Sequence, residues 1–241
     1  MPLVLHVDWA IDCTSVSVVD SAAHSIVGEG RGLHSEFGGE TDPETWWSAL
    51  GVASARALDG LAAMGLSIDD IGIVMMSDND PAGGLLAFDS SHSLVHPALV
   101  GEHHDSVEDA QWLCEQSSAW TSATGVEPFA GSTIALLSWL HRNEPQAWNS
   151  VDHVTLPIGY LTERVGGDAT LSTVVAMGTA VVDRRQPTEW CYELLSIVDA
   201  NADWKAILPV ITTAATPVGL VSKKAAQHLG VKAAIPIHVG A

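Results

Sequence analysis

Residues 3–20 read LVLHVDWAIDCTSVSVVD, and their pattern decides how the chain begins to fold. Apolar and polar residues alternate over residues 3–8 and again over residues 14–20, which is typical of β-strands with one buried face. Ala10-Ile11-Asp12 separates the two runs and predicts a turn. A third strand is expected near Ser25–Leu33. Three short consecutive strands predict an antiparallel meander.

A helix follows the meander and leads to a different kind of strand. Asp42 can cap this helix, Pro43 suits its first position and Glu44 lies near its positive end. Its apolar residues recur at helical spacing, so one face is expected to be buried: Trp46, Leu50, Ala53, Ala57 and Leu61. Ile71–Met76 is nearly all apolar, which is typical of a buried parallel strand. This order predicts an α/β domain of the ribonuclease H-like (actin-type ATPase) class, with a mixed sheet and flanking helices.

The second half of the chain predicts four more helices and no second domain. These helices are expected over Val107–Trp120, Ser132–Asn143, Thr188–Val198 and Ser222–Leu229. Ser132 is a candidate N-cap, Pro145 is expected to stop the helix that it precedes, and Gly230 is expected to end the last helix. Because no repeat and no low-complexity linker divides the chain, we expect one domain over residues 1–241. A lid-like insertion is expected at about residues 90–130.

Composition narrows the classes of partner. A chain of 241 residues that is 47% hydrophobic can bury a full core. Its net charge of −19 repels nucleic acid and anionic lipid, so neither is expected as a partner. No apolar run approaches the ~18 residues that a membrane span needs. Three widely separated cysteines, Cys13, Cys114 and Cys191, suit the reducing cytoplasm, which we predict as the location.

Short motifs recur in a characteristic order further along the chain. They are DPETWW at residues 42–47, WLHRNEP at residues 139–145, LPIGYLT at residues 156–162 and Met177-Gly178-Thr179. In this order and spacing they resemble the N-terminal domain of FGGY carbohydrate kinases, closest to xylulokinases. The resemblance implies that these 241 residues lack the family's second, ATP-binding domain.

The resemblance also marks where that family keeps its chemistry, and the chain departs from the pattern there. In active members Gly-Thr follows the first-strand Asp, and backbone N–H groups of that loop cradle phosphate. Here Asp8 is kept, but Ala10 and Ile11 follow, and Asp12 adds a like charge to the loop. The family's catalytic Asp falls on or next to Val175, which cannot accept a hydroxyl proton. We therefore expect no catalytic residue, and a phosphate loop that is closed to nucleotide.

Six residues are candidates for ligand binding, because the resemblance places them at the phosphate loop or near the sugar-contacting loops: Asp8, Trp9, Asp12, Asp78, Asp80 and His103. Each also has an ordinary structural role. The two acids of the phosphate loop can satisfy backbone N–H groups of a turn. Trp9 can fill a cavity instead of stacking on a sugar ring. His103 and its acidic neighbours can form an exposed polar loop. We expect no metal site, since adjacent residues on a strand point to opposite faces.

Three functions remain open at this point. The first is a catalytically inactive, pseudokinase-like domain that binds a sugar-like molecule or a protein. The second is half of a genuine ATP-dependent sugar kinase of xylulokinase type, completed by a separate ATP-binding domain. Only this second function needs Mg·ATP, and no cofactor is expected for the isolated chain. The third is a structural, self-associating domain. We expect a homodimer, because a surface that a second domain would cover seldom stays exposed.

Overall fold

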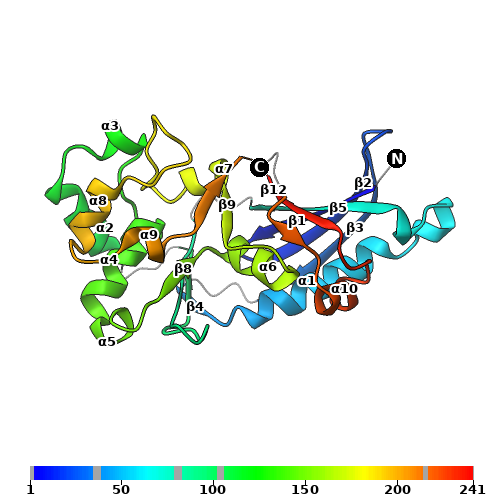
Figure 1. Cartoon of the computed structure of the whole chain (residues 1–241), viewed down its shortest axis with the longest axis horizontal. Helices are drawn as coiled ribbons and strands as arrows, with labels where there is room; N and C mark the ends of the chain where they lie inside the picture. Colours follow the sequence, from blue (N-terminus) through cyan, green and yellow to red (C-terminus); the bar gives the residue numbers. More distant parts are fainter. Residues whose placement is uncertain (1–2, 35–38, 79–82, 102–105, 214–216, 241) are drawn as a thin grey trace.

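The computed structural model describes residues 3–34, 39–78, 83–101, 106–213 and 217–240, and its main feature is one mixed sheet. The strand order is β11-β12-β5-β1-β2-β3 (Figure 1). Their bounds are Leu3–Ala10 for β1, Cys13–Asp20 for β2, Ser25–Leu33 for β3, Ile71–Asp78 for β5, Gly219–Leu220 for β11 and Pro236–Val239 for β12. The first three strands form the predicted antiparallel meander. A mixed sheet with flanking helices agrees with the α/β class predicted from the order of elements.

The buried apolar strand β5 lies inside the sheet, as its composition predicts. It runs parallel to β1 on one side and parallel to β12 on the other. Three parallel strands therefore lie side by side in the order β12-β5-β1. Their carboxyl ends meet at one edge of the sheet, which is where open α/β sheets hold their ligands.

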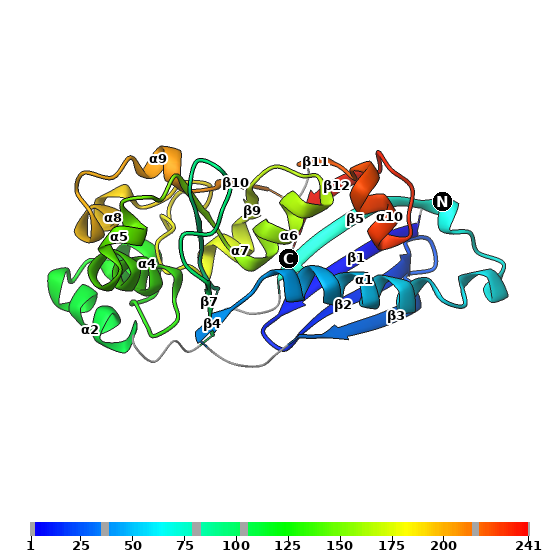
Figure 2. The same ribbon diagram turned by 90° about the horizontal axis from the view of Figure 1, so that it is seen from below.

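Helix α1 (Glu44–Leu58) lies on β2 and β3 at very short range (Figure 2). Every second residue of β3 from position 28 to position 32 is glycine, and each faces an alanine carbonyl oxygen of α1. A Cβ atom added at Gly30 would lie 2.0 Å from Ala53 O. The helix backbone therefore rests directly on the strand backbone. Before α1, Asp42 Oδ1 accepts a hydrogen bond of 3.0 Å from Glu44 N, but the N-cap position is taken by Pro43, one residue later than predicted.

The two faces of the sheet have different surroundings. Along β1, Leu5, Val7 and Trp9 are buried on the face that α1 covers, whereas His6 and Asp8 are half-buried on the other face. Two more helices, α6 (Pro157–Val165) and α10 (Lys223–Leu229), pack against α1 (Figure 2).

Side chains of α1 and α6 hold these two helices together. Arg164 Nη2 donates to Glu44 Oε2 at 3.1 Å, and Arg164 Nη1 also contacts Glu44 and Tyr160. The guanidinium lies 4.8 Å from the centre of the Trp47 ring. The Arg164 hydrogen bonds are the main reason why the pKa of Glu44 is lowered.

The remaining elements form three small sheets and a group of helices at the other end of the molecule (Figure 1). The pairs are β4 (Gly39–Thr41) with β7 (Ala98–Val100), β6 (Leu86–Phe88) with β8 (His153–Thr155), and β9 (Thr170–Ser172) with β10 (Val210–Thr212). The helices are α2 (Ser106–Gln116), α3 (Trp120–Thr124), α4 (Thr133–Asn143), α5 (Pro145–Trp148), α7 (Thr173–Met177), α8 (Tyr192–Val198) and α9 (Trp204–Ile207). No described helix is long and apolar enough to span a bilayer.

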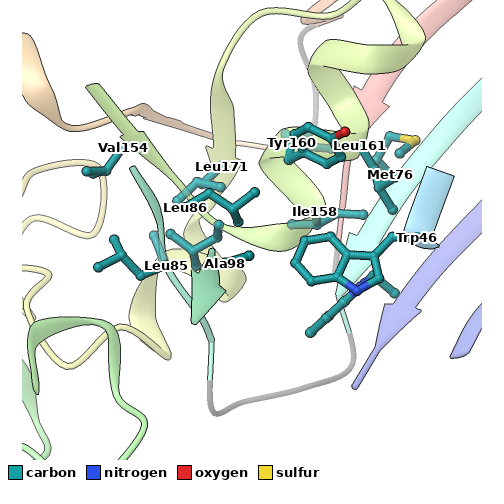
Figure 3. Packing of buried hydrophobic residues seen from close by; sticks show 14 of the residues in the cluster. Trp46, Met76, Leu85, Leu86, Ala98, Val154, Ile158, Tyr160, Leu161 and Leu171 are labelled. Carbon is teal, nitrogen blue, oxygen red and sulfur yellow. The ribbon is translucent and has the colours of Figure 1, made fainter. Parts of the chain in front are cut away.

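One hydrophobic core joins the two ends of the molecule. Leu86 and Leu171 of the small sheets pack near Ile158 of α6, as Figure 3 shows. Tyr160, also of α6, meets Trp46 of α1 edge to face, with ring centres 6.1 Å apart. Helix α6 therefore lies at the centre of the core, and the described residues share a single cluster of buried side chains.

Three helix predictions need correction. The helix expected over Val107–Trp120 is two helices, because Trp120 Nε1 donates to Leu113 O at 2.8 Å and turns the chain back. The helix expected from Thr188 begins only at Tyr192, since Trp190 is held in a β-bridge. Ser132 precedes α4, but its Oγ donates to Phe129 O at 2.7 Å and makes no capping bond. The lid-like role of residues 90–130 stays a prediction.

Candidate ligand site at the strand ends

Asp8 lies near the carboxyl end of β1, directly opposite Ser77 of β5. Ser77 is buried, with 1% of its surface exposed, and its Oγ donates a hydrogen bond to Asp8 Oδ1. His6 Nε2 lies 3.1 Å from the same Ser77 oxygen, and His6 Nδ1 lies 3.7 Å from Asp8 Oδ2. The Asp8 carboxylate is thus held in place by two neighbours, while 24% of its side chain remains exposed.

A cavity of ≈ 580 Å³ opens beside Asp8, on the face of the sheet away from α1. Polar side chains from three neighbouring strands line it: His6 and Asp8 of β1, Ser15 and Ser17 of β2, and Glu29 and Arg31 of β3. Both signs of charge and several hydroxyl groups are present, which suits a small polar molecule better than an apolar one.

Asp12 is not the isolated charge that the sequence suggested. Arg31 Nη2 lies 2.5 Å from Asp12 Oδ2, and the two residues form an ion pair across β2 and β3. The expectation that Asp12 adds an unbalanced negative charge to the phosphate loop is therefore wrong. Arg31 was missed because it lies 19 residues away in the sequence. Only the register, which sets Arg31 opposite Ser15, brings it to the turn.

Trp9 is not available to a ligand. None of its surface is exposed, and its ring meets Trp46 edge to face at 5.4 Å and stacks on His34 at 6.2 Å. Trp9 shares the inward face of β1 with Leu5 and Val7. The candidate role in stacking on a sugar is therefore wrong, and the alternative role of filling the core is confirmed.

The other sequence candidates divide between the described and the undescribed parts of the chain. Asp78 is the half-buried last residue of β5, opposite Trp9 in the parallel register. Asp80 and His103 lie outside the described residues. Val175 lies in the short helix α7, where its backbone N–H donates to Ser172 Oγ at 3.2 Å. The structure therefore brings Asp8, Asp78 and the Asp12–Arg31 pair to the same strand ends.

The fold is that of the actin-like ATPases, which confirms the ribonuclease H-like class predicted from the sequence, and comparison with known proteins identifies the family. The family model described as the FGGY family of carbohydrate kinases, N-terminal domain, matches residues 30–241, and the chain belongs to this family. A xylulose kinase of Streptomyces coelicolor is 34% identical over 184 residues, which cover 74% of this chain and 36% of that protein.

Solved structures agree on the fold. The xylulose kinase of Rhodospirillum rubrum superposes with a TM-score of 0.83 at 17% identity, over 99% of this chain and 49% of that one. The gluconate kinase of Lactobacillus acidophilus gives a TM-score of 0.82 at 18% identity, over 100% of this chain and 48% of that one. The chain thus spans less than half the length of each of these relatives.

Proposed function

We propose that this chain is the sugar-binding half of a xylulokinase-type carbohydrate kinase, and that it transfers no phosphate by itself. The resemblance to xylulose kinases of known sequence supports the substrate class. The observation that supports the second part is Val175, an aliphatic residue on or next to which the resemblance places the family's catalytic carboxylate. Loss of a general base typically lowers a rate by ~10²–10⁴-fold.

The strand-end cavity supports the binding of a polar ligand. Serine hydroxyl groups, two carboxylates, a histidine and a guanidinium line it, and these groups supply both donors and acceptors. The Asp12–Arg31 pair removes one objection to nucleotide binding. An unpaired carboxylate about 4 Å from a phosphate costs up to ~4 kcal/mol near a protein surface, whereas a carboxylate that is already paired costs less.

A phosphorylation assay tests the proposal. Purified chain is mixed with D-xylulose and Mg·ATP, and ADP release is followed. We expect no turnover above background, and turnover would overturn the claim of inactivity. Val175→Asp and wild-type chains are then assayed together with the separately produced C-terminal half of the Streptomyces coelicolor xylulose kinase. A rate of ADP release at least ~100-fold higher for Val175→Asp than for the wild-type chain would support the assigned position of the base.

Titration of Mg·ATP by calorimetry separates this proposal from a split kinase. Sub-millimolar binding that is lost in Asp8→Ala would mean that the phosphate loop still works, and it would favour the split kinase. D-xylulose binding without Mg·ATP binding would favour the sugar-binding half.

Exposed apolar residues favour self-association as a second candidate. Val174 and Met177 of α7, which lie three residues apart and so on one side of this short helix, are each 53% exposed. Such residues are more often covered by a partner when they form a patch. We propose a homodimer through this surface. Light scattering at high protein concentration tests it, and a strictly monomeric mass would count against it.

A further inference from the structure

His34, the residue that follows β3, packs against the turn that joins β1 to β2. Its backbone N–H donates to Asp12 O at 3.1 Å, and its ring nitrogen Nε2 lies 3.4 Å from Thr14 Oγ1. The ring stacks on Trp9 at 6.2 Å and lies 6.3 Å from the Trp46 ring, measured between ring centres. Only 7% of His34 is exposed, so a buried imidazole joins this turn to the start of α1.

The imidazole has a hydrogen-bond partner for one nitrogen only. Nδ1 of His34 is buried and has no partner among the described residues. A neutral ring tolerates this, because Nε2–H can donate to Thr14 Oγ1 while Nδ1 carries no hydrogen. A charged ring has an N–H at both nitrogens, so the second N–H would be buried without an acceptor. The present position therefore suits the neutral form of His34.

The charges around His34 do not remove this penalty. Burial is the main reason why the pKa of His34 is lowered from its ordinary value of 6.5. The carbonyl groups of Ile11 and Cys13 and the charge of Asp12 favour the charged ring, but burial outweighs them. Asp12 also has a cation already, since it pairs with Arg31. A protonated His34 ring is therefore more stable outside its present position.

A cavity of ≈ 500 Å³ lies next to the ring and can receive it. His34 lines this cavity together with Asp42 and Glu44, at the start of α1. The two carboxylates stabilise a cation there. Inside the protein, the ring centres of Trp9 and Trp46 lie beyond the ~6 Å at which an aromatic face attracts a cation strongly. The neutral ring thus has an inner position, and the charged ring has an outer one.

We propose that His34 is a pH-sensitive switch with two positions. In the closed form the neutral ring packs on Trp9 and holds the turn between β1 and β2. In the open form the protonated ring lies in the cavity beside Asp42, and the turn is released. Because this turn follows Asp8 closely, the switch would change the shape of the strand-end site in mild acid. It does not depend on whether that site binds a sugar.

Cys13 reports the switch, because it is a buried thiol at the start of β2 and should become accessible in the open form. The protein is labelled with 4,4′-dithiodipyridine, and mass spectrometry compares Cys13 with the half-buried Cys114. Both thiols lose reactivity in parallel as the pH falls, so their ratio isolates the opening. Between pH 7.5 and pH 5 we expect this ratio to rise at least ~threefold. The limit is about thirtyfold, set by the ordinary pKa of 6.5 in the open form.

Three variants test the origin of the rise. His34→Phe keeps an aromatic ring that cannot be protonated, so its labelling ratio should not change with pH. His24→Asn is the matched control, since His24 is exposed in the turn after β2, and it should behave like wild type. Asp42→Asn removes a carboxylate from the outer position and should reduce the rise. The far-UV circular dichroism of wild type should stay constant over the same range.

The proposal is overturned if the wild-type ratio is constant between pH 7.5 and pH 5, if it rises equally in His34→Phe, or if Asp42→Asn leaves the rise unchanged. A loss of far-UV circular dichroism together with the rise would also overturn it, since the whole fold would then open. Wild-type protein provides a measurement without variants. In ¹⁵N NMR the His34 ring and the Trp9 indole N–H should change at the same pH, below 6.5, and separate midpoints would contradict the switch.

Discussion

Two regions of the molecule are packed in opposite ways: the contact between α1 and β3, and the surroundings of Glu163 in α6. At the first, glycine and alanine let two backbones touch. At the second, a carboxyl group lies buried, with one oxygen that has no partner among the described residues. The first arrangement gains stability from close packing, whereas the second loses stability whenever Glu163 is ionised. The difference indicates that the α1–β3 contact is scaffold, whereas Glu163 is held in the fold at a cost in stability.

The largest loss of stability is expected at the contact between α1 and β3, where the packing is closest. Gly30→Ala places a Cβ atom 2.0 Å from Ala53 O, a backbone atom that cannot turn away, so α1 must move off β3. We expect a loss of at least ~4 kcal/mol in the free energy of unfolding, at the upper end for single substitutions. Urea denaturation followed by circular dichroism measures it.

Gly60→Ala is the control for that experiment. Gly60 has no atom within 4 Å of an added Cβ, but its φ is +92°, so only backbone strain of about 1–2 kcal/mol is expected. If Gly30→Ala lowers the free energy of unfolding by no more than Gly60→Ala does, the α1–β3 contact is looser than the structure shows.

A pH-dependent effect is expected at Glu163. Its pKa is raised from 4.5 to about 7 on folding, so the neutral acid is favoured in the folded state. Below pH 4.5 both states are protonated and no stability is lost. Between pH 4.5 and pH 7 the unfolded chain releases its proton while the folded protein keeps it, so the folded protein loses about 3 kcal/mol of stability over that range and no more above it. Glu163→Gln should therefore be more stable than wild type by that amount at pH 8, and equally stable at pH 4.

Denaturation curves at the two pH values decide the point, with Glu108→Gln as the exposed control. A Glu163→Gln variant that is less stable than wild type at pH 8 would mean that the carboxylate has a partner in solution. The contrast between the two regions would then disappear.

A smaller effect is expected where polar groups are paired but partly exposed. Arg164→Met removes the hydrogen bonds to Glu44 and Tyr160 and the contact with the Trp47 ring. Because 25% of the Arg164 side chain and 58% of the Glu44 side chain are exposed, we expect a loss of only about 1 kcal/mol. Thermal unfolding measures the loss, with Lys223→Met as the control, since Lys223 is an exposed residue of α10. A loss of stability larger than that caused by Gly30→Ala would mean that the Arg164 contacts stabilise the fold more than the α1–β3 contact does.

Parts of the strand-end site could be predicted from the sequence. The alternation that predicts β1 also places Trp9 on the same face as Leu5 and Val7. The predicted alternation stopped at Asp8, so Trp9 fell outside the strand. For that reason Trp9 was assigned to ligand binding instead of to the core. Arg31 carried no local signal, because its distance to Asp12 depends on the pairing of β2 with β3. The close contact of α1 with β3 had a signal in the alternating glycines of β3, which are matched by alanines one turn apart in α1.

The sequence alone determined the elements whose cause is local. Period-two alternation placed the first two strands of the meander, and an apolar run placed β5. Ser222, which accepts a bond of 3.1 Å from Ala225 N, and Gly230, with φ +71°, placed the ends of α10. Only the tertiary structure decided which charges meet and which carboxyl group is buried alone. Register and burial join residues far apart in the chain, and their energies depend on surroundings that no short stretch of sequence contains.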